Sequence, residues 1–301
     1  MGALDGRVVI ITGAGRGLGR EHALLFAKEG AMVVVNDLGG GPDGTGSDKT
    51  AAEQVVDEIH ALGGAAVANG DNVADWDGAK RLIDSAVEAF GDLHVLVNNA
   101  GILRDRKMVN MSEAEWDAVV NVHLKGTFAP THFAALHWRA QAEAGKTVNA
   151  AIVNTSSTAG LHANVGQANY GSAKMGIAAF TQICAKELKK LGVRSNAIAP
   201  AARTRLTEAT PGFDEIMKAP EDPNAFDPWD PANISPLVAY LATADCPFTG
   251  QVFSVFGDEI GQYQSWTIAH MLKNDGRRWT VEELAAAAKE LPLKIDVRRP
   301  L

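Results

Sequence analysis

The chain has 301 residues, of which 46% are hydrophobic, so it can bury a substantial core in one large domain. Its formal net charge at pH 7 is −8, and it has no basic stripe of the kind that binds nucleic acid. It also has no run of about 18 or more apolar residues that would predict a membrane span.

The first predicted strand, at residues 7–12, is an apolar, β-branched run typical of a buried parallel strand. It leads into a glycine-rich turn at residues 13–19, and a helical pattern follows as far as Gly30. This is the context of a dinucleotide fingerprint, because glycines let the backbone approach a pyrophosphate and a helix N-terminus offers free N–H groups. We therefore expect a dinucleotide cofactor at this turn.

The second predicted strand, residues 32–37, ends at Asp37, which lies 18 residues beyond Gly19. A carboxylate there can bind the adenosine ribose and would repel a 2′-phosphate, which favours NAD over NADP. Arg16 instead favours NADP, because a cation in the turn can bind that phosphate. The carboxylate has more weight, since it would sit directly at the ribose. The alternative, in which Asp37 only caps a surface turn, stays open.

Five further strands are predicted, near residues 65–69, 93–97, 149–154, 193–199 and 251–256. Strands and helices alternate, which indicates a parallel sheet with right-handed crossovers. The predicted fold class is therefore α/β, with a Rossmann-type, doubly wound sheet of seven strands. Ligands of such sheets bind at the carboxyl ends of the strands, and four candidate residues fall at such ends: Asp37, Asn99, Ser157 and Pro200.

Tyr170 and Lys174 are spaced four residues apart, and positions i and i+4 share a face of a helix. A nearby ammonium lowers the pKa of a phenol, whose reference value is about 10. Tyr170 can then exchange a proton with a substrate oxygen that a serine hydroxyl holds in place. A tyrosine and a lysine at this spacing also occur on solvated helices, so the pair gains its meaning from the motifs around it.

Together these motifs resemble the short-chain dehydrogenase/reductase family. The turn at residues 12–19 matches its pattern T-G-x-x-x-G-x-G, and residues 98–101 match N-N-A-G. Tyr170 and Lys174 match Y-x-x-x-K, with Ser157 thirteen residues before the tyrosine. The resemblance covers most of the chain and implies an oxidoreductase that interconverts a secondary alcohol and a ketone with a nicotinamide cofactor.

The resemblance also implies a role for each matching position. Tyr170 is the acid/base, Lys174 lowers its pKa and holds the nicotinamide ribose, and Ser157 positions the reacting oxygen. Ser156 is the adjacent competitor for that last role. The positions implied in NAD binding, from the pyrophosphate through the adenosine to the nicotinamide, are Gly13, Arg16, Gly17, Leu18, Gly19, Asp37, Asp71, Asn72, Val73, Asn99, Ala100, Gly101, Tyr170, Lys174, Pro200 and Ala201.

Two positions depart from the family pattern. The family's V-N-L-x-G-x-F segment carries an asparagine of the proton relay, and the matching residue here is His123. An imidazole can serve a relay, with an unperturbed pKa near 6.5, or it can simply bond to a backbone carbonyl. Position 201 is alanine where the family usually has glycine, and alanine suits a backbone that approaches the nicotinamide only if its φ is negative.

A closer resemblance lies in residues 34–40, 101–106 and 122–126. These segments are similar to the (3R)-hydroxyacyl-CoA dehydrogenase domains of peroxisomal multifunctional enzymes and to related actinobacterial enzymes. The substrate implied is a 3-hydroxyacyl-CoA or a steroid-like molecule. The rival within the enzyme class is an NADPH-dependent 3-oxoacyl carrier-protein reductase. The rival from another class is a nucleotide-binding regulator without turnover.

We expect residues 1–261 to form the NAD-binding catalytic domain and residues 262–301 a C-terminal extension. Within the domain, the proline-rich segment 203–236 is predicted to be a lid that closes on substrate. The alternative is a loop packed permanently on the core. In the extension, Thr280 and Glu283 resemble a capping box and predict a short helix.

Further expectations concern surroundings and partners. Cys184 and Cys246 lie in unrelated segments, so we expect neither a disulfide framework nor a metal site. No signal peptide is recognised, which favours a cytoplasmic location. The family resemblance implies a homodimer or homotetramer, with contacts from helices around residues 112–143 and 170–191.

Overall fold

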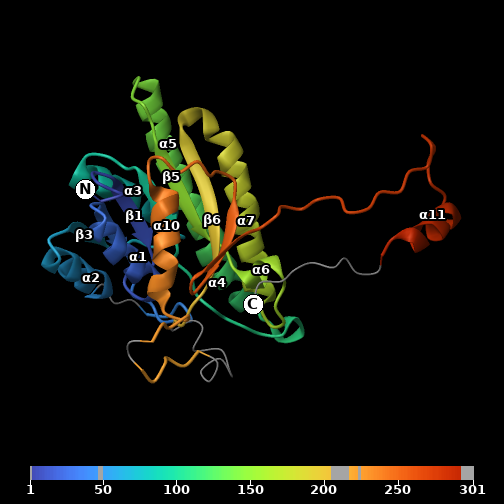
Figure 1. Ribbon diagram of the computed structural model, residues 1–301, viewed down its shortest axis with the longest axis horizontal. Coiled ribbons are helices and arrows are strands. Elements are labelled where there is room, and N and C mark those ends of the chain that lie inside the picture. Colours follow the sequence, from blue (N-terminus) through green and yellow to red (C-terminus); the bar gives the residue numbers. More distant parts are fainter. Residues whose placement is uncertain (1, 47–49, 205–216, 223–224, 293–301) are drawn as a thin grey trace.

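The computed structural model describes residues 2–46, 50–204, 217–222 and 225–292. Its centre is one sheet with the strand order β3-β2-β1-β4-β5-β6-β7-β8, and helices cover both faces (Figure 1). The strands are β1 (Val8–Thr12), β2 (Met32–Asn36), β3 (Ala65–Asn69), β4 (Val95–Asn98), β5 (Ala150–Thr155), β6 (Val193–Ala201), β7 (Val252–Phe256) and β8 (Glu259–Gln262). The helices are α1 (Gly17–Lys28), α2 (Thr50–Ala61), α3 (Trp76–Phe90), α4 (Glu113–Val120), α5 (Gly126–Glu143), α6 (Thr158–Leu161), α7 (Ala168–Glu187), α10 (Ser235–Ala242) and α11 (Val281–Ala287).

The Rossmann-type parallel sheet is confirmed, but the predicted number of strands was one too low. Strands β1 to β7 are parallel to their neighbours, while β8 runs antiparallel to β7. A two-residue turn joins these last strands, and its Gly257 has a φ of 53°. Positive φ suits such hairpin turns. The β8 residues Glu-Ile-Gly-Gln are few and largely exposed, so they show no apolar pattern that predicts a strand.

The strand order places the ligand-binding edge. β1 pairs with β2 on one side and with β4 on the other, so the direction of winding reverses between β1 and β4. The helix α1, which follows β1, and the helix α5, which comes after β4, therefore lie on opposite faces of the sheet, and the connections of β1 and β4 diverge above their carboxyl ends. In doubly wound sheets this divergence opens a crevice.

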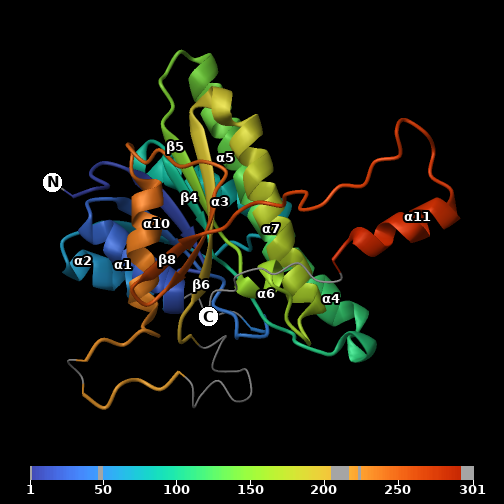
Figure 2. The same ribbon diagram turned by 45° about the vertical axis from the view of Figure 1, so that its right-hand side comes forward.

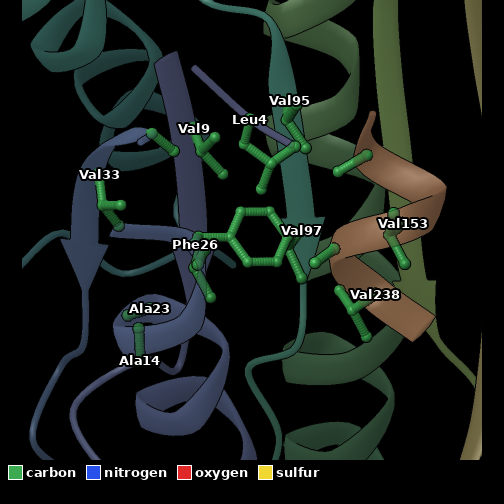
Figure 3. Packing of buried hydrophobic residues seen from close by; sticks show 14 of the residues in the cluster. Leu4, Val9, Ala14, Ala23, Phe26, Val33, Val95, Val97, Val153 and Val238 are labelled. Atoms are coloured by element: carbon green, nitrogen blue, oxygen red, sulfur yellow. The ribbon is translucent and has the colours of Figure 1, made fainter. Parts of the chain in front are cut away.

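The two faces of the sheet bury separate apolar layers. On one face, Phe26 of α1 lies among the side chains of Val9, Val97 and Val238, which come from β1, β4 and α10 (Figure 3). On the other face, Trp138 of α5 is fully buried, and its indole N–H donates to the Leu93 carbonyl at 2.7 Å. Packing on both faces explains why the central strands are almost continuously hydrophobic.

The tail beyond β8 extends away from the body to α11, as both views show (Figure 2). The predicted capping box is confirmed, because the Thr280 hydroxyl accepts from the Glu283 N–H at 3.1 Å and Glu283 accepts from the Thr280 N–H at 3.0 Å.

Of the predicted lid, residues 205–216 and 223–224 lie outside the described residues. Among the described residues, no helix is both long and apolar enough to cross a membrane.

Candidate active site

The glycine-rich turn between β1 and α1 packs directly against the residues that follow β4. A Cβ on Gly13 would lie 2.7 Å from the Ala100 Cα, and one on Gly19 would lie 2.1 Å from the Gly13 carbonyl oxygen. Asn99 donates to the Thr12 and Gly13 carbonyls at 3.0 and 3.2 Å. Only glycine fits at these contacts, and the turn leaves a cradle at the N-terminus of α1 where backbone N–H groups can meet a pyrophosphate.

Asp37 stands just beyond β2, between this turn and the loop that follows. One carboxylate oxygen accepts from the Gly15 N–H at 2.8 Å, and the other accepts from the Gly39 N–H at 2.7 Å. A carboxylate oxygen has two lone pairs, so each can still accept from a ribose hydroxyl. Asp37 thus caps a turn and also faces the cleft, and the two interpretations of this residue are compatible.

The segment that follows β3, residues 71–73, also lines the cleft at the carboxyl edge of the sheet. The Asp71 carboxylate binds the Arg81 guanidinium at 2.6 Å, and the Asn72 side chain accepts from the Ala74 N–H at 2.9 Å. Val73 is 4% exposed. An apolar side chain beside fixed polar groups is a surface that suits an adenine ring.

A cleft of about 400 Å³ gathers most of the predicted residues at the carboxyl edge of the sheet. Gly19, Ser157 and Ala201 do not line it directly. The predicted residues that do are Gly13, Arg16, Gly17, Leu18, Asp37, Asp71, Asn72, Val73, Asn99, Ala100, Gly101, His123, Tyr170, Lys174 and Pro200. Further lining residues, to which the sequence analysis gave no site role, are Asn36, Leu38, Gly40, Gly41, Pro42, Gly44, Ile102, Val122, Thr155, Ala202 and Thr204.

The two candidate serines have different partners. The Ser156 hydroxyl donates to the Lys174 carbonyl at 2.8 Å, which uses its only proton inside the protein. Ser157 caps α6, where its hydroxyl accepts from the Ala159 N–H at 3.1 Å, and it is also hydrogen-bonded to the Tyr170 phenol. The geometry therefore favours Ser157 as the hydroxyl beside the reacting oxygen.

Tyr170 and Lys174 lie side by side on α7, as the spacing predicted. The Lys174 ammonium is 5.5 Å from the centre of the Tyr170 ring and donates to the Thr155 carbonyl at 2.6 Å. Burial lowers the pKa of Lys174 to about 7.

The Tyr170 phenol does not show the lowered pKa that the spacing predicted. Burial raises the pKa of Tyr170 to about 12, against the effect of the Ser157 hydrogen bond, and the charge of Asp105 raises it further. The ammonium of Lys174 is held by a backbone carbonyl instead of by the phenol, so burial outweighs it in this structure.

His123 is buried in a π-helical turn, Asn121–Lys125, between α4 and α5. Its Nε2 is 2.8 Å from the Ile102 carbonyl oxygen and 3.1 Å from the Ile102 nitrogen, so the bond to a backbone carbonyl is present. The ring also meets the Tyr170 ring edge-on, with centroids 5.1 Å apart. Burial, and then the charge of Lys174, lower the pKa of His123 to about 3, so the imidazole is neutral near pH 7.

Contact with Gly101 holds this imidazole in place. A Cβ at position 101 would lie 2.4 Å from the imidazole Cε1, so only glycine fits there. The His123 Nδ1 is buried and has no partner among the residues that the structure describes. π-helical turns are frequent at functional sites.

Ala201 ends β6, paired with Phe256 of β7. In the described part of the chain, the non-glycine residues with positive φ are Ala163 and Asp275, so Ala201 has a negative φ that alanine tolerates. Pro200 and Ala202 face the cleft on either side of it. The alanine in place of the family's glycine therefore causes no strain.

Neither cysteine lies at this site. Cys184 and Cys246 are buried, and both are free thiols. Burial raises the pKa of the Cys184 thiol to about 12. Within the described ranges, no three histidine, cysteine or acidic side chains converge as metal ligands would.

A family model described as short chain dehydrogenase matches residues 7–212. The chain belongs to this family. A short-chain dehydrogenase of this kind is an oxidoreductase that uses NAD(P) on CH–OH groups, and the family predicted from the motifs is confirmed.

The chain is also similar to individual proteins of this family. The chain is 42% identical over 295 residues to a hydroxyacyl-CoA dehydrogenase of Mycobacterium tuberculosis, covering 95% of this chain and 89% of the relative. It is 45% identical to peroxisomal multifunctional enzyme A of Dictyostelium discoideum, covering 83% of this chain but only 52% of that longer protein. A crystal structure of a short-chain dehydrogenase from Mycobacterium avium matches with a TM-score of 0.85 and 50% identity, over 96% of this chain and 95% of that one.

Proposed function

We propose that the protein interconverts a secondary alcohol and a ketone with NAD, and that its substrate is a 3-hydroxyacyl-CoA or a steroid-like molecule. One observation carries the proposal: a single cleft brings Tyr170 and Lys174 together with the glycine turn and Asp37. The similarity to a hydroxyacyl-CoA dehydrogenase supports the substrate class.

The residues at the cleft fit a nicotinamide dinucleotide. The cradle at Gly13 and Gly19 has no room for side chains, and Asp37 offers two carboxylate oxygens to a ribose. The Thr155 hydroxyl is buried at the cleft without a partner in the described structure, so it can bond to a ligand there. When bound, the nicotinamide accepts or supplies a hydride at the carbinol carbon.

The protein's part in the reaction is to hold the oxygen and to move a proton. In the direction of oxidation, Ser157 donates a hydrogen bond to the substrate oxygen, and the Tyr170 phenolate takes the hydroxyl proton. The pKa of Tyr170 must fall from about 12 for this step, and a close cation lowers it. Lys174 is the resident cation, and its ammonium and a phenolate beside it stabilise each other.

We propose that His123 extends this proton path, because its neutral ring can change tautomer without moving. In one tautomer Nε2–H donates to the Ile102 carbonyl, and in the other Nε2 accepts from the Ile102 N–H. In both tautomers Nδ1 is left to exchange a proton with another group.

Two proposals concern the larger architecture. Within segment 203–236, Arg203 forms an ion pair with Asp227 and its side chain donates to the Met217 carbonyl at 2.6 Å, so the start of the segment is bonded to its later described parts. This supports a lid with a fixed base, and slower cleavage by protease in the presence of NAD would test it.

We also propose a homodimer or homotetramer, since Phe128 of α5 and Ile183 of α7 are 42% and 50% exposed. Light scattering measures the oligomer directly.

The decisive experiment is a spectrophotometric screen for NADH formation. The panels are 3-hydroxyacyl-CoA esters, hydroxysteroids and simple secondary alcohols, each with NAD and with NADP. We expect turnover with NAD on the first or second panel, and Tyr170→Phe should lower kcat by about 10²-fold or more. A preference for NADPH with 3-oxoacyl carrier protein would favour the reductase, and binding of NAD without turnover on any panel would favour a regulator.

A further inference from the structure

The loop that follows β2, residues 39–46, forms part of the wall of the cleft. It contains five glycines, and Gly39, Gly44 and Gly46 have positive φ values of 77°, 84° and 76°. Two internal backbone bonds fold it, from Gly41 N–H to the Thr45 carbonyl at 2.7 Å and from Gly44 N–H to the Gly41 carbonyl at 2.9 Å. Such a glycine-rich loop loses much conformational entropy when it is ordered, so its contacts decide where it lies.

One side of this loop faces the cleft beside Asp37. The Asp37 carboxylate holds the first residue of the loop, Gly39, by the N–H bond of 2.7 Å. Further residues of the loop line the cleft itself: Gly40, Gly41, Pro42 and Gly44. A ligand whose ribose binds at Asp37 therefore touches the loop directly.

The other side of the loop holds the segment after β4. The Pro42 carbonyl accepts from the Leu103 N–H at 2.9 Å, and the Asp43 carbonyl accepts from the Arg104 side chain, also at 2.9 Å. The Gly44 backbone lies against Ile102, so closely that a Cβ there would be 3.0 Å from the Ile102 Cδ1.

The same segment holds the start of the catalytic helix α7. The Arg104 carbonyl accepts from the Asn169 amide at 3.0 Å, and Asn169 in turn accepts from the Tyr170 N–H at 2.7 Å. Asn169 is fully buried and also donates to the Glu115 carbonyl at 3.1 Å, so all its bonds are to protein. A second link runs from the Arg106 N–H to the Gly166 carbonyl at 2.8 Å.

We propose that loop 39–46, Arg104 and Asn169 form a brace through which occupation of the adenosine site at Asp37 fixes the position of Tyr170. This inference rests on the proposed function, because it takes the ligand at Asp37 to be the adenosine half of NAD. Arg104 and Asn169 are positioning residues in this scheme, since both act on the reaction only through Tyr170.

Adenosine diphosphate (ADP) tests the brace, because it carries the adenosine and pyrophosphate but no group that reaches Tyr170. We would measure hydrogen–deuterium exchange in peptides covering residues 13–19, 101–107 and 166–171, with and without ADP. The brace predicts that ADP slows exchange by about threefold or more in all three, because local opening then costs more free energy. Slowing in peptide 13–19 alone would overturn the brace and leave the proposed function intact. No slowing with either ADP or NAD would overturn both.

Variants at position 104 test the link itself. Arg104→Ala removes the donor to the Asp43 carbonyl but keeps the Leu103–Pro42 backbone bond, so ADP should still slow peptide 13–19 fully and should slow peptide 166–171 less than in the unaltered protein. Arg104→Lys keeps a cationic donor and should restore at least part of the effect. The matched control is Lys107→Ala, which removes an exposed cation from the same segment and should behave as the unaltered protein does. If Arg104→Ala kept the full slowing at 166–171, Arg104 would not be part of the brace, and the measurements on the unaltered protein stand even if a variant fails to fold.

Discussion

At the scale of single residues, Asp37 does more than face a ribose. Its two oxygens hold the glycine turn on one side and the loop after β2 on the other. A substitution there changes both charge and structure, so the test of cofactor choice must keep the shape of the side chain.

Asp37→Asn keeps the size of that side chain and removes its charge. Its NH2 group cannot accept from one of the two backbone N–H groups, and this loss affects binding of both cofactors alike. We expect the ratio of kcat/KM for NAD to that for NADP to fall about tenfold or more, since the repulsion of a 2′-phosphate is lost. The control is Asp71→Asn, at a cleft carboxylate already bound to Arg81, for which we expect a smaller change in the ratio. An unchanged ratio in Asp37→Asn would contradict the assignment of NAD to this residue.

His123 has a prediction of its own. Replacing it with alanine removes the group that we propose as the relay, so kcat should fall about tenfold and the pH profile of kcat should change shape. His123→Asn, which restores the family's side chain, should recover part of the activity. Unchanged turnover at every pH in the alanine variant would remove His123 from the mechanism.

At the scale of elements, the parallel strands could be predicted closely because most of them are short apolar runs, although β6 begins with Val-Arg-Ser-Asn. The π-helical turn at Asn121–Lys125 was not predicted, because no local pattern distinguishes it from an α-helix, and its His123 packs against Gly101, which is distant in sequence. The motifs located the cradle, Asp37 and the Tyr170–Lys174 pair. They did not indicate the cleft wall from loop 39–46, whose place depends on backbone bonds to residues 103 and 104.

The start of α1 gives a prediction for an element. In Gly19→Ala, the added Cβ would meet the Gly13 carbonyl oxygen at 2.1 Å, and that backbone must move. We expect NADH affinity to fall about tenfold or more and the free energy of unfolding to drop by about 1–3 kcal/mol. Fluorescence titration and urea unfolding measure both. Gly176→Ala is the control, because its Cβ would meet only the flexible end of Leu124, at 3.2 Å.

At the scale of the whole molecule, buried histidines connect stability to pH. His22 of α1 is fully buried with its Nδ1 2.8 Å from the Ser235 hydroxyl, and burial lowers its pKa to about 3. The unfolded chain takes up this proton below about pH 6.5, while the folded protein does so only near pH 3. The contribution of His22 to stability is therefore complete above about pH 6.5 and is lost as the pH falls toward 3.

His22→Asn keeps a polar group near Ser235 but cannot titrate. Between pH 6 and pH 4, the free energy of unfolding of the unaltered protein should fall more steeply than that of the variant, by about 1.4 kcal/mol per pH unit. Urea unfolding at several pH values measures the two slopes. Equal slopes would show that His22 is not held neutral in the fold.

The tail gives a second prediction at this scale. Between β8 and α11 the described chain has no helix or strand, and Trp266 is 88% exposed. We expect brief trypsin treatment to cut at Lys273, Arg277 or Arg278 and to leave the sheet intact, with Tyr263 still bonded to His162 at 3.1 Å. Mass spectrometry identifies the cuts. Resistance at these sites would mean that another surface covers the tail in solution.

The environment of Lys174 also has a consequence for chemical labelling. While Tyr170 is protonated, burial lowers the pKa of Lys174 to about 7, so part of this side chain is an uncharged amine at pH 7.5, and a Tyr170 phenolate would hold the proton on it. Ordinary exposed lysines, with a pKa near 10.4, remain almost fully protonated. Only the uncharged amine is a nucleophile. A small acylating reagent that enters the cleft should therefore modify Lys174 ahead of the surface lysines, which makes this side chain a natural attachment point for a covalent inhibitor.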